Sequence, residues 1–359
     1  LRECIDKVDE EMRRLARADG YLNLFKPKIQ VENPHIVRSW GFAVAYKNTG
    51  LGGGAPDKAG AEVELYPDGT LEVRTSSAEL GQGLVTVLQM IIAEEFSVPA
   101  ERVKVLVMDT DLTPDGGPTT ASRQTYVTGN AARYAAQTLR EAMTTSLAER
   151  FDQPPEQIQF VEGLAQVNGH RVSLGEVVEI MRSEGREPKV LYEYWAPKTQ
   201  PLGTGGDMHF AFSFAAQAAE VAVNTLTGEV DVLRVIAAND VGKAINPLGL
   251  QGQVEGGVVM GIGHALTENF IVDDGIPFTD RLARYRMPNI TQTPEITSFV
   301  VEALTTEGPY GAKGVGEIVS IPTIPAITNA IYHAVGVRID RLPVDQELIV
   351  AELAKKGSR

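Results

Sequence analysis

Apolar positions recur along the chain with two different periods, which predicts both helices and strands. Apolar residues at three- and four-residue steps are typical of amphipathic helices, whereas strict alternation is typical of half-buried strands. The turn Pro67-Asp-Gly69 between two alternating runs predicts a hairpin. In the first half of the chain we expect helices over 5–15, 84–96, 132–147 and 176–182, and strands over 36–46, 61–66, 70–75, 103–107 and, as a small meander, 160–173.

The same order of elements is predicted a second time. Residues 218–224 and 229–236 form a second hairpin around Thr227-Gly228, and a glycine-bearing helix follows from about 249 to 266. A closing helix begins near Pro322. We therefore expect an α+β fold with two related sheet-and-helix units. Its expected parts are an N-terminal helix and linker (1–34), a first unit (35–200), a second unit (201–345) and a C-terminal helix or tail (346–359).

We expect the first predicted helix to be already under way where the chain begins. The chain begins at Leu1 rather than at a methionine. We expect it to be a piece of something longer; the alternative is that a tag of a few residues is missing.

Composition and charge narrow the class of protein. With one cysteine, Cys4, the 359 residues cannot form an internal disulfide, a four-cysteine iron–sulfur site or a structural zinc site of cysteines. A net charge of −14 disfavours binding to the phosphate backbone of duplex nucleic acid. No apolar run approaches the roughly 18–20 residues that cross a bilayer. The single thiol fits a reducing compartment, and we expect a cytoplasmic protein.

Glycine is in excess, with 35 residues, and its placement points to ligand binding. Polar turns at 81–83, 119–125, 252–255 and 311–317 each sit at the start of a predicted helix. The N-terminus of a helix offers unpaired N–H groups to an anion, and glycine lets the backbone approach a ligand closely. Any one such turn is explained by ordinary capping and packing. Together with the uncharged side chains of Gln82, Ser122 and Gln253, the four turns favour a large anionic cofactor.

Glu317 is the candidate acid or base of the last turn. At the edge of an apolar helix start, its carboxylate could be desolvated, which would favour the neutral form and suit a general base. It could equally cap the helix N-terminus, which would favour the ionised form. The glycines of 311–317 do not have P-loop spacing, and the five histidines do not have metal-ligand spacing.

An ordered set of motifs resembles the xanthine dehydrogenase/aldehyde oxidase family, also called the molybdenum hydroxylases. The resemblance is to the C-terminal half of the molybdopterin-binding subunit and covers roughly residues 35–345. The motifs that carry it are Glu79-Leu-Gly-Gln-Gly83, Asp109-Thr-Asp111, Pro118-Thr-Thr-Ala-Ser-Arg123, Gly129-Asn130, Gly252-Gln-Val-Glu-Gly256 and Gly311-Ala-Lys-Gly-Val-Gly-Glu317.

The resemblance implies a cofactor and a role for each matching residue. The cofactor would be molybdopterin, in its cytosine dinucleotide form, whose dithiolene holds the molybdenum without protein ligands. Glu317 would be the catalytic base for a water-derived nucleophile that hydroxylates a carbon of an N-heterocycle or aldehyde. Residues implied to bind the cofactor are Gly81, Gln82, Gly83, Ala121, Ser122, Arg123, Gln124, Thr125 and Gln253, and those implied to wall the substrate pocket are Asn48, Thr49, Gly50 and Leu51.

Other parts of such an enzyme are expected on partner chains. These are the N-terminal half of the molybdenum subunit, a 2Fe-2S subunit and an FAD subunit, assembled as a dimer of heteromers. We expect no hydroxylase activity from this chain alone. The alternative is a catalytically incomplete fragment or assembly subunit that binds partners without holding cofactor, and an unrelated nucleotide-binding protein is disfavoured because neither phosphate-loop pattern is present.

Overall fold

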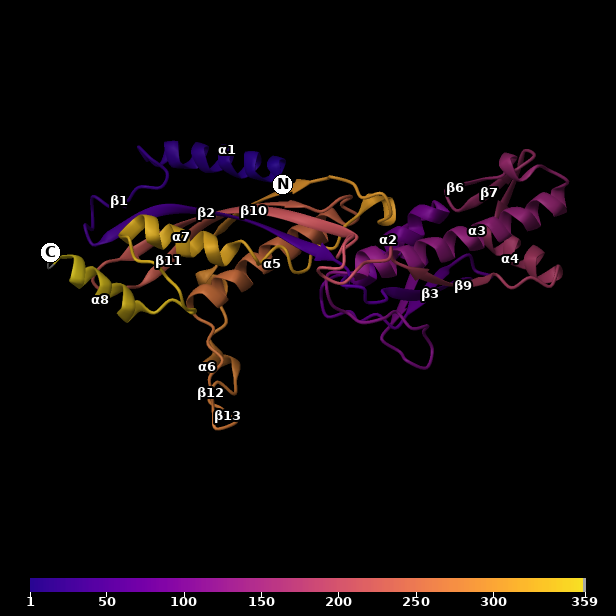
Figure 1. Ribbon diagram of the computed structural model, residues 1–359. Helices are drawn as coiled ribbons and strands as arrows, with labels where there is room; N and C mark the ends of the chain where they lie inside the picture. The colour runs from indigo at the N-terminus through magenta and orange to yellow at the C-terminus, as the bar shows by residue number, and fades with distance from the viewer. Residues whose placement is uncertain (358–359) are drawn as a thin grey trace.

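The computed structural model describes residues 1–357 and shows two lobes lying end to end, each with a β-sheet and helices packed on it (Figure 1). The α+β prediction is therefore confirmed. The two hairpin-then-helix segments are also present, one in each lobe. Among residues 1–357, no helix is both long and apolar enough to cross a membrane.

The first lobe is built on a four-stranded sheet in the order β5-β4-β3-β9. Its strands are β3 (Lys58–Leu65), β4 (Leu71–Thr75), β5 (Val103–Val107) and β9 (Lys189–Trp195). Ala59, Ala61, Val63 and Leu65 alternate along β3 and are fully buried. They share a core with residues of α2 (Leu84–Phe96) and α3 (Gly129–Phe151), so these two helices cover that face of the sheet.

A small sheet extends the first lobe, as the sequence predicts. It consists of β6 (Gln159–Val161), β7 (Leu164–Val167) and β8 (His170–Ser173), all antiparallel. Helix α4 (Leu174–Ser183) follows directly, and Ser173 with Glu176 forms a capping box at its start.

The second lobe is built on a five-stranded sheet in the order β1-β2-β10-β11-β14. The strands are β1 (Lys28–Ile29), β2 (Ile36–Thr49), β10 (Ala211–Asn224), β11 (Val230–Asp240) and β14 (Glu295–Val301). Helix α1 (Arg2–Ala18) covers one face, and α5 (Pro247–Leu266) and α7 (Thr323–Val335) cover the other (Figure 1).

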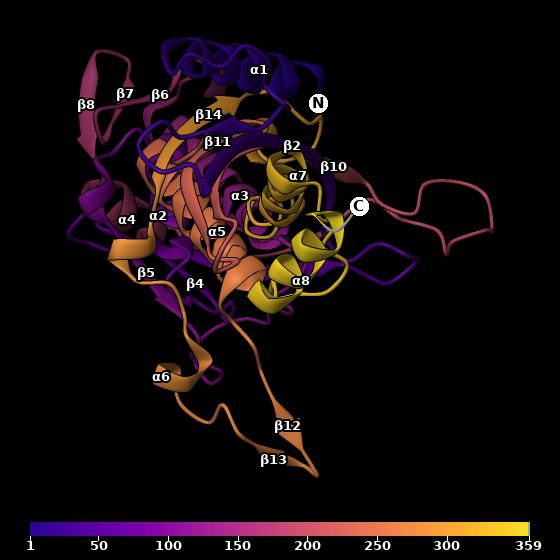
Figure 2. The same cartoon turned by 90° about the vertical axis from the view of Figure 1, so that its left-hand side faces the viewer.

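Two further segments complete this lobe. Helix α8 (Gln346–Gly357) buries Ile349 in the same core as α5 and α7. Strands β12 (Val272–Asp273) and β13 (Ile276–Pro277), with helix α6 (Leu282–Tyr285), form an arm that projects away from the lobe (Figure 2).

Strand β2 differs from the expected division of the chain. The sequence predicts that residues 35–200 form the first unit, but β2 pairs with β10 over its whole length, from Ile36 opposite Asn224 to Thr49 opposite Ala211. Its buried residues belong to the cores of the second lobe. Alternation in a sequence predicts a strand but not its partner, which explains the error.

Candidate functional site

Loops from both lobes meet around a cavity of about 330 Å³. The loops 119–125 and 314–317 line it together with Leu80, Gln82 and one side chain of α5. A second cavity of about 80 Å³ shares part of this lining and adds Gly83. Of the residues implied to bind cofactor or to catalyse, the first cavity brings together Gln82, Ala121, Ser122, Arg123, Gln124, Thr125, Gln253 and Glu317.

Two glutamine side chains connect the turn 81–83 with the loop 119–125. Nε2 of Gln82 donates to Oε1 of Gln124 at 2.7 Å, and Nε2 of Gln124 donates to Oγ1 of Thr119 at 2.8 Å. The Nε2 groups of both glutamines also donate to the carbonyl of Ala78, each at 2.9 Å. The amides therefore fix the wall of the cavity before any ligand binds.

Gln253 lies in both cavities and keeps its amide free. Within residues 1–357, no hydrogen bond to this side chain is formed, so it can both donate to and accept from a ligand. The expectation that 252–255 starts a helix is wrong. Helix α5 begins at Pro247, where Oδ1 of Asn246 accepts the N–H of Gly249 at 3.0 Å, so Gln253 acts through its side chain.

The N-terminus of α2 is filled by a carboxylate of the same chain. Oε1 of Glu79 accepts the N–H groups of Gly81 and Gly83 at 2.8 and 3.0 Å, and Oε2 accepts that of Val85 at 2.9 Å. Burial would raise the pKa of Glu79, but these backbone hydrogen bonds outweigh it and lower the pKa below its ordinary value. The expected anion site at this helix is thus occupied by Glu79 in the free chain.

The Arg123 side chain makes its contacts inside the protein. Its side chain is fully buried, and its Nε lies 2.7 Å from Oδ1 of Asp57. The remaining guanidinium nitrogens donate to the carbonyls of Gly116, Pro118 and Lys58. These contacts use four of the five N–H donors of the Arg123 side chain, which is therefore held inside the protein.

The segment 48–51 lies behind the cavity rather than in its wall. None of its four residues is among those that line it. Oγ1 of Thr49 accepts the N–H of Gly314 at 3.3 Å, and the N–H of Gly50 donates to the carbonyl of Ala121 at 2.9 Å. Asn48 donates to the carbonyl of Gly50 at 2.6 Å, and Leu51 donates its N–H to Asp57. The segment therefore supports two of the loops that form the cavity.

The loop 119–125 contains two residues in the left-handed region. Both Ala121 and Ser122 have φ near +51°, which is uncommon outside glycine and costs about 1–2 kcal/mol per residue. Close packing maintains this conformation, because a Cβ on Gly314 would lie 1.6 Å from the carbonyl oxygen of Ser122. Such conformations persist where the surrounding structure holds them, and they cluster at functional sites.

The surroundings of the Glu317 carboxylate differ from both expected arrangements. Its side chain is 48% exposed, and it stands well before the start of α7 at Thr323, so it is neither desolvated nor a helix cap. Instead, Oε2 of Glu317 accepts from Oγ of Ser122 at 2.7 Å and lies 3.0 Å from Nζ of Lys47.

Sequence reasoning missed two residues of this site, Lys47 and Glu79. Lys47 stands directly before the segment 48–51, but its contact with Glu317 joins positions far apart in the chain. Glu79 was recognised only as the first residue of a motif and not as a cap. Glu79 lies five residues before the first residue of α2, outside the N-cap position directly before a helix, so the usual capping pattern does not predict this role.

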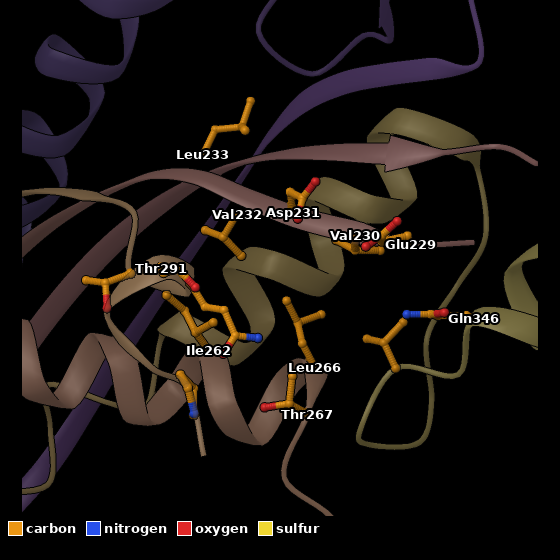
Figure 3. A pocket seen from close by; sticks show the side chains of 14 residues that line it. Glu229, Val230, Asp231, Val232, Leu233, Ile262, Leu266, Thr267, Thr291 and Gln346 are labelled. Atoms are coloured by element: carbon orange, nitrogen blue, oxygen red, sulfur yellow. The ribbon is translucent and has the colours of Figure 1, made fainter. Parts of the chain in front are cut away.

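Another cavity, of about 370 Å³, lies between β11 and the end of α5, and Val232, Ile262 and Leu266 point into it (Figure 3). None of the candidate site residues lines it. Over residues 1–357, no group of three or more His, Cys, Asp or Glu side chains could hold a metal ion.

Comparison with known proteins identifies the family. Residues 17–294 match the model of the molybdopterin cofactor-binding domain. The chain belongs to this family, whose members in the xanthine dehydrogenase and aldehyde oxidoreductase class are molybdenum-binding subunits. The matched range ends before Glu317, so the family model does not cover the candidate base.

Individual relatives agree with this assignment. The chain is 32% identical over 326 residues to a probable xanthine dehydrogenase subunit of Bacillus subtilis, covering 90% of this chain and 43% of the relative. It is 34% identical to the gamma subunit of the 6-hydroxypseudooxynicotine dehydrogenase complex of Paenarthrobacter nicotinovorans, over 82% of this chain and 38% of that subunit. The crystal structure of the aldehyde oxidoreductase from Desulfovibrio desulfuricans superimposes with a TM-score of 0.80 at 29% identity, over 98% of this chain and 35% of that one. The chain thus spans less than half the length of these proteins.

Proposed function

We propose that this chain is the molybdopterin-binding part of a molybdenum hydroxylase that oxidises a carbon of an N-heterocycle or aldehyde with water-derived oxygen. The observation that carries the proposal is the cavity of about 330 Å³, where Glu317 lies with Gln253 and the loop 119–125. Membership of the molybdopterin family supports the cofactor, and the geometry supports Glu317 as the base.

The residues of the cavity fit a pterin. Pterin edges carry amide-like donors and acceptors, and the free amide of Gln253 and the backbone of 121–125 offer matching groups. Gly81 and Gly83 have φ of +101° and +88°, and a Cβ on either would meet nothing within 4 Å, so the space beside them is open to a ligand. We propose that Gly81, Gln82, Gly83, Ala121, Ser122, Gln124, Thr125 and Gln253 hold the cofactor. When bound, the cofactor supplies a metal centre that accepts two electrons from the substrate.

Residues of this chain orient the cofactor, accept the proton and support the substrate pocket. Gln253 orients the cofactor by its amide, and the strained Ala121-Ser122 turn presents its backbone to the same cavity. Glu317 accepts a proton at Oε1, the carboxylate oxygen that no described residue of the chain engages. The segment 48–51 acts on the substrate pocket from behind, by fixing Gly314 and Ala121.

Several finer features belong to the same proposal. The pterin is in its cytosine dinucleotide form, and electrons leave through a 2Fe-2S subunit and an FAD subunit. The N-terminal half of the molybdenum subunit completes the active site, since the relatives are more than twice as long as the region matched. The assembly is a cytoplasmic dimer of heteromers.

Replacing Glu317 by Gln in the assembled enzyme tests the role of the base. Glu317→Gln keeps the shape of the side chain and removes its ability to accept a proton, so we expect turnover to fall by at least about a hundredfold. Molybdenum content should remain that of the wild type. Glu193→Gln, an exposed carboxylate of the first lobe, is the matched control. Unchanged turnover in Glu317→Gln would refute the proposal.

A second candidate is a subunit that binds partners without holding cofactor by itself. Two observations favour it: the relatives are far longer than this chain, and Glu79 already fills the N-terminus of α2. Molybdenum analysis and nucleotide release on the isolated chain separate the two candidates. Bound molybdenum would contradict the second candidate, and turnover by the loaded chain with an artificial acceptor would contradict our expectation that it is inactive alone.

A further inference from the structure

The carboxylate of Glu317 is held by one of its two oxygens. Oε2 accepts the hydroxyl of Ser122 at 2.7 Å and lies 3.0 Å from the ammonium of Lys47. No residue in the described part of the chain engages Oε1. A carboxylate that is bound through Oε2 alone has a defined orientation, and its Oε1 keeps lone pairs that can accept a proton.

The Ser122 hydroxyl forms two hydrogen bonds with Glu317. Besides donating to Oε2, its Oγ accepts the backbone N–H of Glu317 at 3.2 Å. The position of this hydroxyl depends on the left-handed conformation of Ser122. It also depends on Gly314, whose lack of a side chain lets the loop 311–317 lie against the Ser122 carbonyl. The strain in the turn is thus coupled to the placement of the base.

Lys47 is equally well fixed. Its Nζ donates to the carbonyl and to Oδ1 of Asn48, at 3.0 and 3.1 Å, and forms an ion pair with Glu317, 3.0 Å from Oε2. The Lys47 side chain is 19% exposed, and its backbone pairs with Ser213 near one end of β2 and β10. Oγ of Ser213 donates to the carbonyl of Gly314 at 2.7 Å, which ties the same strand pair to the Glu317 loop.

We propose that Lys47 and Ser122 are positioning residues that bind Oε2 of Glu317 and thereby present Oε1 to the cavity. The inference rests on the proposed function, in which Glu317 is the base. An exposed glutamate samples several rotamers, and a base must be held within a few tenths of an ångström of its working position. Because exposed ion pairs add little stability, the effect of Lys47 is expected in turnover rather than in folding.

The first test needs no cofactor. Hydrogen exchange of the Glu317 amide is measured in the full chain by NMR or by fragmentation mass spectrometry. In Ser122→Ala this amide loses its acceptor, and we expect exchange at least about fivefold faster than in the wild type. Lys47→Met removes a contact to the Glu317 side chain only, so it should leave the exchange rate of the Glu317 amide unchanged. Ser183→Ala, at an exposed serine of α4, should also leave this rate unchanged. Unchanged exchange in Ser122→Ala would overturn the role of Ser122.

The second test uses the assembled enzyme. We expect Lys47→Met to lower kcat about tenfold with KM within twofold, and Lys47→Arg, which keeps a cation, to recover most of the loss. Lys189→Met, whose ion pair with Glu62 lies elsewhere in the first lobe, is the control. If Lys47→Met keeps the wild-type kcat, or if only its KM rises, the proposed role of Lys47 is overturned. Normal turnover of Glu317→Gln would instead refute the proposed function, whatever the exchange result.

Discussion

The hydroxyl of Tyr310, in the second lobe, donates a hydrogen bond to Oε1 of Glu95, in the first lobe, at 2.8 Å. Glu95 is 5% exposed, and Nε of Arg133 lies 2.9 Å from the same oxygen. The Arg133 guanidinium also lies over the Tyr310 ring, 4.4 Å from its centre. Burial, together with the charge of Glu95, raises the pKa of Tyr310, so it remains a donor. This contact fixes the two lobes to each other just before the Glu317 loop.

Tyr310→Phe should therefore destabilise the chain. The substitution leaves a buried carboxylate with one donor fewer, which costs about 1.5–3 kcal/mol in the free energy of unfolding. Urea unfolding followed by circular dichroism measures the difference. Tyr46→Phe is the control, because the Tyr46 ring is 69% exposed and its hydroxyl has no partner within residues 1–357. Equal stability of the two variants would show that the contact with Glu95 contributes nothing.

The sequence predicts local structure here better than contacts between distant residues. The hairpin around Pro67-Asp-Gly69 and the apolar face of α2 follow from neighbouring residues, and both are present. The start of α5 was also predictable, because Asn246 and Pro247 are a typical N-cap and first helical residue, although the expected start near 249 is slightly late. The partner of β2 was not predictable, since any alternating strand could have paired with it.

The candidate site shows the same limit. Motifs indicated which loops form the cavity, and the structure brings most of their residues together. They did not indicate that Arg123 turns inward to Asp57 or that Lys47 meets Glu317. Each contact joins two residues of the same lobe that lie far apart in the chain, and no local period encodes such a pairing.

Glu79→Gln should reduce stability in a pH-dependent way. The pKa of Glu79 is lowered in the folded chain, so its stabilising effect is present above its ordinary value of 4.5 and is lost as the pH falls through the folded value. We expect a loss of about 1 kcal/mol at neutral pH, as for removal of a helix N-cap. Thermal unfolding at a series of pH values measures it.

The control for this prediction lies on the same helix. Glu94→Gln replaces an exposed carboxylate of α2 that makes no hydrogen bond or ion pair within residues 1–357. The difference between wild type and Glu79→Gln should shrink below about pH 4.5, whereas Glu94→Gln should follow the wild type throughout. A Glu79→Gln difference that is the same at neutral pH and at about pH 3.5 would contradict the capping role.

Arg123→Lys tests whether Arg123 is structural. Lysine cannot reproduce the fork that reaches Asp57 and three carbonyls, so a buried carboxylate loses its partner. We expect a loss of about 3 kcal/mol or more in the cofactor-free chain. Arg171→Lys, at an exposed position of β8, should have no effect. If Arg123→Lys has the same free energy of unfolding as Arg171→Lys and lowers only the cofactor content of the assembled enzyme, Arg123 acts on the cofactor instead.

Gly314→Ala tests the close approach on which the position of Glu317 depends. The new methyl group would lie 1.6 Å from the carbonyl oxygen of Ser122, and backbone must move to admit it. We expect a loss of about 1–3 kcal/mol in unfolding free energy, as for an overpacked core, with faster exchange of the Glu317 amide. Gly256→Ala is the matched control, because a Cβ at this α5 position meets nothing within 4 Å and alanine is favoured in a helix by about 1 kcal/mol. A Gly314→Ala variant as stable as Gly256→Ala, with unchanged exchange at Glu317, would show that the loops 119–125 and 311–317 are not held by this contact.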